Sequence, residues 1–161
     1  MARIWSDENF AVEAVEQPHV TRTDGGHIVI NPLMPVADRT QLAPRLSIRL
    51  MRLTVTVGSS MSSVLPARGI PIGRINYQDN GNWAQARGEE PYLHIHCYGR
   101  ATNAVIQRFG EALYFPRPES GFYDGNVPLN AGDVAALREE IVRLLASPEF
   151  SDRAWGLERE H

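Results

Sequence analysis

Residues 92–100 read Tyr-Leu-His-Ile-His-Cys-Tyr-Gly-Arg, and this stretch decides the fold and the candidate site. Successive side chains of a β-strand point to opposite faces of the sheet. The alternation therefore predicts a strand whose polar face carries Tyr92, His94, His96 and Tyr98. The opposite face, with Cys97 among apolar neighbours, is expected to pack into the core. Two imidazoles on one strand face contribute little to packing, so the pattern indicates a chemical role.

Short β-branched or alternating segments elsewhere predict the rest of a sheet. They lie at residues 10–15, 19–22, 27–30, 74–78 and 112–115. His19 is expected to be an exposed strand residue in the second of these segments. The polar or Pro- and Gly-rich connections, which are typical of loops, are residues 59–71, 79–91 and 116–128.

Apolar stripes with helical spacing predict two helices. The first begins after Asp38, whose carboxylate can accept hydrogen bonds from the free N–H groups of the first turn, and ends at residues 58–60. Its stripe is Leu42, Leu46, Leu50, Leu53 and Val57. The second helix covers residues 130–146 and stops before Pro148.

The order of strands, a long helix and further strands is typical of an α+β fold rather than a βαβ series. We expect an antiparallel sheet of about five strands, with the long helix packed on it and a C-terminal helix following. A chain of 161 residues suits one domain, which we place at residues 1–147. Residues 148–161 are charged but contain Trp155, and are expected to be a C-terminal tail or a dimer-docking arm.

The composition excludes several classes of protein. With 16 basic and 19 acidic residues the formal charge is −3, which argues against a nucleic-acid partner. Every basic residue is arginine, so no lysine is available for a Schiff base or a phosphate-binding loop. The sequence lacks an apolar run of about 18 residues, which predicts no membrane span. The single cysteine, Cys97, excludes an internal disulfide, and a cytoplasmic location is expected.

Paired imidazoles serve two kinds of chemistry. As metal ligands, His94 and His96 would need a third ligand, and no carboxylate follows at short spacing, so we expect no metal. As a nucleophile, a neutral imidazole attacks phosphorus to give a phosphoramidate, which water then hydrolyses. The second imidazole either contacts the phosphate or supplies a proton to the leaving group. Arg100, just beyond the strand, is placed to meet an anion.

Three motifs in this order resemble those of the histidine triad family. Residues 26–32, Gly-His-Ile-Val-Ile-Asn-Pro, resemble the family's Gly-His strand, which a short loop and a long helix follow, as here. Residues 75–77, Ile-Asn-Tyr, resemble the strand before the catalytic loop. Residues 92–100 resemble the catalytic strand, with Tyr92 in place of the first of its three histidines. The resemblance covers about residues 10–100 and identifies a divergent histidine-triad-like protein.

The resemblance implies a homodimeric nucleotide hydrolase or nucleotidyl transferase that needs no cofactor. Such an enzyme acts at an α-phosphate through a nucleotidyl-histidine, on phosphoramidates or dinucleoside polyphosphates. By position, His94 is then the nucleophile and His96 contacts the phosphate and the leaving group. His27 and Tyr92 are expected to support the two from behind. The residues expected to hold the substrate or its phosphate are Asn76, Arg100 and Gly88.

Two departures from the family pattern leave a second function open. With Tyr92 in place of a histidine, the usual orienting relay is lost or remade through a phenol. Glu89 and Glu90 stand where the family often has Gln and Ser or Thr, and two carboxylates repel an anion. The alternative is therefore a catalytically degenerate nucleotide-binding or regulatory module on the same fold. Its ligand would be a nucleotide or another phosphorylated small molecule.

Overall fold

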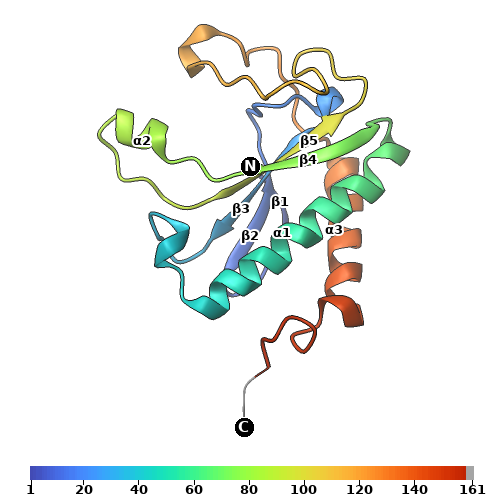
Figure 1. Ribbon diagram of the computed structural model, residues 1–161. Helices are drawn as coiled ribbons and strands as arrows, with labels where there is room; N and C mark the ends of the chain where they lie inside the picture. The colour runs from blue at the N-terminus through green and yellow to red at the C-terminus, as the bar shows by residue number, and fades with distance from the viewer. Residues whose placement is uncertain (159–161) are drawn as a thin grey trace.

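The computed structural model describes residues 1–158 and contains a five-stranded antiparallel sheet with the order β1-β2-β3-β5-β4 (Figure 1). The strands are β1 (Ala2–Ser6), β2 (Phe10–Ala14), β3 (His27–Pro32), β4 (Ile72–Gln78) and β5 (Ile95–Ala101). The helices are α1 (Pro44–Val64), the short α2 (Asn82–Ala86) and α3 (Ala131–Leu145). The expected α+β fold, with a long helix packed on an antiparallel sheet, is confirmed.

Both long helices lie on the same side of the sheet (Figure 1). Helix α1 packs against β4 and β5, and α3 packs against α1 and β1. The core between the two layers includes Val12, Ile28, Cys97, Leu53, Val57, Leu137 and Ile141. Burying a side chain of this size contributes roughly 1.5–3 kcal/mol. The alternate residues of β3 and β5, among them His27 and His96, point away from the helices, and this second face carries the candidate site.

Two glycines let the turn before β3 lie directly against β5. A Cβ atom on Gly99 would come within 2.1 Å of the Gly25 carbonyl oxygen, and one on Gly25 equally close to the Gly99 oxygen. Gly25 also has a φ of 136°, which residues with a side chain rarely adopt. The N–H of Gly99 donates to the carbonyl oxygen of Gly26 at 3.1 Å. This close approach places the start of β3, at His27, beside β5.

A buried carboxylate ties the same turn to α3. Asp133 is fully buried and accepts hydrogen bonds from Arg22 and Arg68. It also accepts from the Asn130 N–H, while the Asn130 side chain accepts from the Asp133 N–H, which forms a capping box. Burial raises the pKa of Asp133, but the hydrogen bonds from Arg22, Arg68 and the Asn130 N–H, together with the charge of Arg22, leave it lowered overall. The carboxylate therefore stays charged and anchors Arg22, which lies between the loop after β2 and the turn.

Two sequence-based expectations about strands are wrong, and one strand was not predicted. Residues 19–22 and 112–115 are not strands, and the fifth strand is instead β1, at the edge of the sheet. Only Ile4 of β1 is fully buried, so its alternation is too weak to recognise in the sequence. Residues 19–22 follow Pro18 and turn back toward the sheet, where Arg22 begins a short 3-10 turn.

The expected bounds of the long helix are also wrong at both ends. It starts at Pro44, while Asp38 caps a separate 3-10 turn by accepting from the Thr40 N–H. It continues beyond Gly58, because that glycine faces Tyr77 of β4, whose hydroxyl would lie 1.8 Å from an added Cβ. The packing of the helix on the sheet thus outweighs the low helix propensity of glycine. No helix within residues 1–158 combines the length and the apolar character needed to cross a lipid bilayer.

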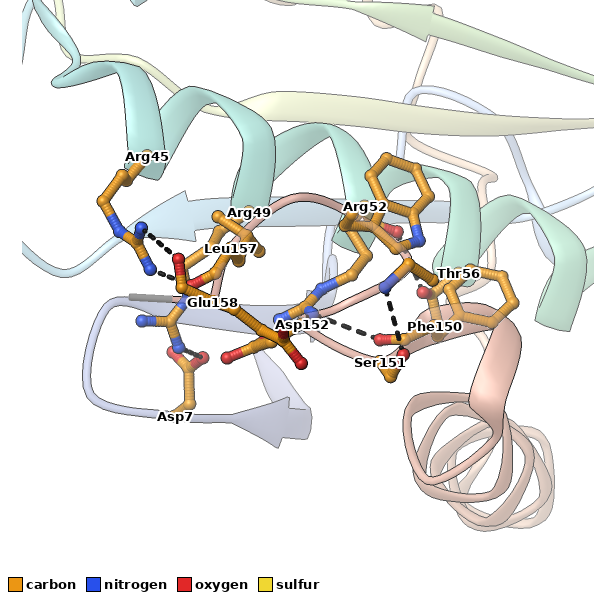
Figure 2. Close-up of polar contacts among 12 residues, drawn as sticks. Asp7, Arg45, Arg49, Arg52, Thr56, Phe150, Ser151, Asp152, Leu157 and Glu158 are labelled. Atoms are coloured by element: carbon orange, nitrogen blue, oxygen red, sulfur yellow. Dashed lines mark hydrogen bonds and ion pairs between the residues drawn. The ribbon is translucent and has the colours of Figure 1, made fainter. Parts of the chain in front are cut away.

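The segment after α3 folds back onto α1 of the same chain (Figure 2). Arg52 donates to the carbonyl oxygen of Phe150 at 3.1 Å, and Arg45 donates to that of Leu157. Phe150 and Leu157 are both buried. The segment expected to be a tail or a dimer-docking arm is therefore anchored on its own chain at these two residues, while most of its other described residues are exposed, and residues 159–161 lie outside the described part.

Candidate functional site

His94 and His96 lie at the start of β5 on the face away from the helices. His96 is the second residue of β5, and His94 is the residue directly before the strand begins at Ile95. Their ring centroids are 4.4 Å apart, with the ring planes at 76°. The alternation along β5 thus brings both imidazoles to the same place.

Hydrogen bonds behind His96 determine which of its ring nitrogens carries the hydrogen. The backbone N–H of His19 donates to Nδ1 of His27 at 3.2 Å. In a neutral imidazole one nitrogen donates and the other accepts, so His27 carries its hydrogen on Nε2. This Nε2 donates to Nδ1 of His96 at 2.8 Å. His96 consequently carries its hydrogen on Nε2, the nitrogen that remains for the pocket.

The backbone before β5 sets the opposite tautomer in His94. Its Nδ1 lies 3.0 Å from the carbonyl oxygen of Tyr92. A carbonyl oxygen only accepts, so Nδ1 carries the hydrogen and Nε2 keeps a free lone pair. The Tyr92 side chain is 52% exposed. Tyr92 therefore supports His94 through its main-chain carbonyl oxygen, and its ring lies 4.7 Å from the His94 ring between centroids, so the supporting role expected of Tyr92 stays a prediction.

The buried imidazoles are neutral near pH 7. Burial lowers the pKa of His96 to about 3, and the proximity of His94 and His19 acts in the same direction. Burial likewise lowers the pKa of His27 well below its ordinary range, again with help from the neighbouring histidines. His96 is thus a hydrogen-bond donor rather than a cation at neutral pH.

The two histidines open into a pocket of about 380 Å³, within the size range of small-molecule sites. Three loops complete it: the loop after β2 contributes His19, the loop carrying α2 contributes Trp83, and the long loop after β5 contributes Phe115. Sequence analysis missed these three residues. A tryptophan in an otherwise polar loop was a usable signal for Trp83, whereas nothing local marks His19 or Phe115.

The charged residues that line the pocket are one arginine and two glutamates, Arg87, Glu89 and Glu90. Arg87 donates to the Glu89 carboxylate at 2.7 Å, and both side chains are more than half exposed. The pocket lining therefore has a small excess of negative charge, and its cation already has a partner.

Asn76 and Gly88 are not among the residues that line this pocket. Asn76 pairs with Tyr98 across β4 and β5, two residue pairs along the ladder from Gln78, which lies opposite His96 and does line the pocket. Gly88 has a φ of 73° in the turn after α2, where an added Cβ would meet nothing within 4 Å. Its conformation serves the turn.

Arg100 also lies outside the pocket lining, and its hydrogen bonds indicate a structural role. It is 4% exposed, and its guanidinium donates to the carbonyl oxygens of Arg108 and Glu111 at 2.7 and 2.9 Å. These contacts satisfy Nη2 of the buried guanidinium, whereas its Nε has no hydrogen-bond partner among the described residues. We therefore remove Arg100 from the expected phosphate contacts: it holds the loop that carries Phe115.

Comparisons with known proteins give matches in structure only. No protein-family model matches the sequence, and no curated protein matches it. A histidine triad protein from Bradyrhizobium japonicum matches with a TM-score of 0.59 and 18% identity, over 86% of this chain and 89% of that one. A zinc-bound histidine triad family protein from Mycobacterium smegmatis matches with a TM-score of 0.57 and 20% identity, over 88% and 84%. This chain has the histidine triad fold. A hypothetical histidine triad nucleotide-binding protein from Sulfolobus tokodaii strain7 matches with a TM-score of 0.55 and 14% identity, over 89% and 85%.

In this structure β3 and β5 are neighbours in the interior of the sheet, where His27 and His96 meet. Although the M. smegmatis structure is described as zinc-bound, within residues 1–158 of this chain no three His, Cys, Asp or Glu side chains are placed to hold a metal ion. His94 and His96 are fixed instead by hydrogen bonds to Tyr92 and His27.

Proposed function

We propose that this protein hydrolyses or transfers the nucleotidyl group of a nucleotide by nucleophilic attack of His94 on the α-phosphorus. The hydrogen bond from His94 Nδ1 to the Tyr92 carbonyl oxygen carries this proposal. It leaves the lone pair of Nε2 free in a pocket that admits a small molecule. Because the support comes from the backbone, the loss of a histidine at position 92 is compatible with the reaction.

The reaction has two steps. In the first, His94 Nε2 forms a bond to phosphorus while the bond from phosphorus to the leaving group breaks, and the leaving group departs with its electron pair and gains a proton. The modified imidazole is positively charged, and the Tyr92 carbonyl dipole stabilises that charge through Nδ1–H. In the second, water attacks phosphorus, the N–P bond breaks and His94 is restored.

His96 would donate from Nε2 to a non-bridging oxygen of the phosphate. Its lowered pKa, about 3, disfavours the alternative role of a proton donor to the leaving group, because the neutral ring would have to become an anion. His27 keeps the required hydrogen on Nε2 of His96. The leaving group must therefore take its proton from solvent water, and a basic amine does so more readily than a weakly basic phosphate.

The charges of the pocket favour the same kind of leaving group. Glu89 and Glu90 would repel a polyphosphate, whereas an amine that becomes protonated as it departs would be attracted. Among the substrates implied by the family resemblance, we therefore propose nucleoside phosphoramidates over dinucleoside polyphosphates.

Turnover of adenosine 5′-phosphoramidate and of diadenosine tetraphosphate, followed by chromatography of released AMP, tests this function. We expect kcat/KM to be at least about tenfold higher for the phosphoramidate, which corresponds to about 1.4 kcal/mol. Glu89→Gln should narrow this ratio by improving polyphosphate turnover, because it frees Arg87. Glu139→Gln, an exposed change on α3, serves as the control. If AMP binds but neither compound is turned over, the degenerate nucleotide-binding module becomes the better assignment.

We also propose that two copies associate through β4 as a homodimer. β4 is an edge strand, and it borders an apolar groove of about 460 Å³ against α1. Exposed Met51, Val55 and Tyr77 line this groove. An edge with unpaired backbone groups beside an apolar surface suits a second copy whose own β4 extends the sheet.

Light scattering after size-exclusion chromatography is expected to give twice the mass of one chain at micromolar concentration. Val55→Arg should shift the protein to monomer, because it places a charge in the groove. Val142→Arg, at a valine on α3 that is even more exposed than Val55, should leave the mass unchanged. A monomeric wild-type protein, or a dimer insensitive to Val55→Arg, contradicts this assembly.

A further inference from the structure

A third imidazole reaches the pocket from outside the three motifs of the sequence. His19 lies in the loop after β2 and lines the pocket with His94 and His96. Its ring centroid is 5.8 Å from that of His96. Its other neighbours are aromatic, with Trp83 at 5.6 Å and Phe115 at 5.5 Å between centroids.

The side chain of His19 is held by Tyr98, the last polar ring on the site face of β5. Nδ1 of His19 lies 3.1 Å from the Tyr98 hydroxyl. Tyr98 is fully buried, and no other hydrogen bond of its hydroxyl occurs among the described residues. A buried hydroxyl needs an acceptor for its hydrogen, so Tyr98 donates to Nδ1. His19, neutral because burial and the nearby His94 lower its pKa, then carries its hydrogen on Nε2.

This Nε2–H has no acceptor among residues 1–158, since the one side-chain hydrogen bond of His19 uses Nδ1. His96 presents the same kind of donor from the neighbouring wall, for the reason given above. Arg87, the cation in the pocket lining, is paired with Glu89. The pocket therefore offers an anion two neutral N–H donors from imidazoles in place of a free positive charge.

We propose that His19 is a substrate-binding residue that donates from Nε2 to a phosphoryl oxygen beside the one held by His96, and that Tyr98 is the positioning residue that sets its tautomer. This inference rests on the proposed function for the identity of the ligand, a nucleotide phosphate. It adds a contact that neither the histidine pair on β5 nor the strand carrying His27 supplies.

Titration calorimetry with AMP, in a buffer without phosphate, tests the contact without requiring turnover. We expect His19→Ala to weaken AMP binding by about tenfold or more, because a hydrogen bond to a charged oxygen is lost. His19→Gln should restore most of the affinity, since its amide N–H can occupy the place of Nε2–H. A purely structural role for His19 would make the glutamine and alanine variants equally weak.

The tautomer is tested separately by long-range 1H–15N NMR spectra of the histidines. Wild-type protein should show His19 with its hydrogen on Nε2, and Tyr98→Phe should move it toward Nδ1 and weaken AMP binding by a few-fold. Tyr114→Phe, at an exposed tyrosine outside the pocket lining, is the matched control. An Nδ1–H tautomer in the wild type, or AMP affinity unchanged in His19→Ala, overturns the inference. If wild-type protein binds AMP but turns nothing over, only the catalytic proposal fails; if it does not bind AMP, both fail.

Discussion

His94→Ala is expected to lower kcat for a nucleoside phosphoramidate by at least about a thousandfold, because it removes the attacking atom. Its neighbours remain in place: His96 keeps its hydrogen bond to His27, and the Tyr92 carbonyl oxygen is free to bind water. We therefore expect the melting temperature and the affinity for AMP to change little. The loss should fall on kcat, as measured by release of AMP under saturating substrate.

Two further measurements separate a nucleophile from a residue that merely shapes the pocket. Denaturing mass spectrometry at alkaline pH should detect a nucleotidyl adduct on wild-type protein and none on His94→Ala. In His94→Gly, free imidazole should restore part of the turnover by entering the vacated space and attacking in place of the side chain. Retention of more than a tenth of wild-type kcat by His94→Ala would overturn the proposed mechanism.

Gly99→Ala is expected to destabilise the fold by about 3 kcal/mol or more, because its Cβ would lie 2.1 Å from the backbone oxygen of Gly25. Neither atom belongs to a flexible side chain, so the turn or β5 itself must move. The turn is also held by Arg22 through buried Asp133, which restricts that movement. For a protein of this size the change corresponds to a fall in melting temperature of roughly 6–12 °C.

Urea unfolding monitored by far-UV circular dichroism measures the loss. Gly125→Ala is the control, since a Cβ there meets nothing within 4 Å and the residue is not among the glycines with positive φ. We also expect Gly99→Ala to weaken AMP binding, because His27 lies two residues beyond Gly25 and a shifted turn misplaces its bond to His96. A Gly99→Ala protein within about 1 kcal/mol of wild type would show that the contact is looser than described.

The sequence was informative where a signal is local. Alternation along residues 92–98 correctly predicted that His94 and His96 share a face and that Cys97 is buried. The sequence was misleading for the charged residue at the end of the catalytic-strand motif. Arg100 ends the motif and suggested an anion contact, but it is buried outside the pocket lining, and its Nη2 donates to carbonyl oxygens of a loop that only the folded chain brings near.

Strand order, tautomers and the pocket walls could not be read from the chain. His19 lies 79 residues from Tyr98, and His27 lies 69 residues from His96, so no periodicity connects either pair. The tautomer of His94 depends on a backbone carbonyl oxygen, which every residue has. This is why Tyr92 looked like the loss of a functional group in the sequence although the hydrogen bond that orients His94 is present.

By itself the sequence determined an α+β chain with two imidazoles on one side of a central strand, because strand geometry follows from neighbouring residues alone. The tertiary structure decided which nitrogen of each imidazole faces the pocket and that the His19 ring joins His94 and His96 there. It also decided which arginine side chains are already hydrogen-bonded within the protein. Those properties depend on hydrogen-bond partners brought together from distant segments, and a partner's position is set only when the sheet and its loops have folded.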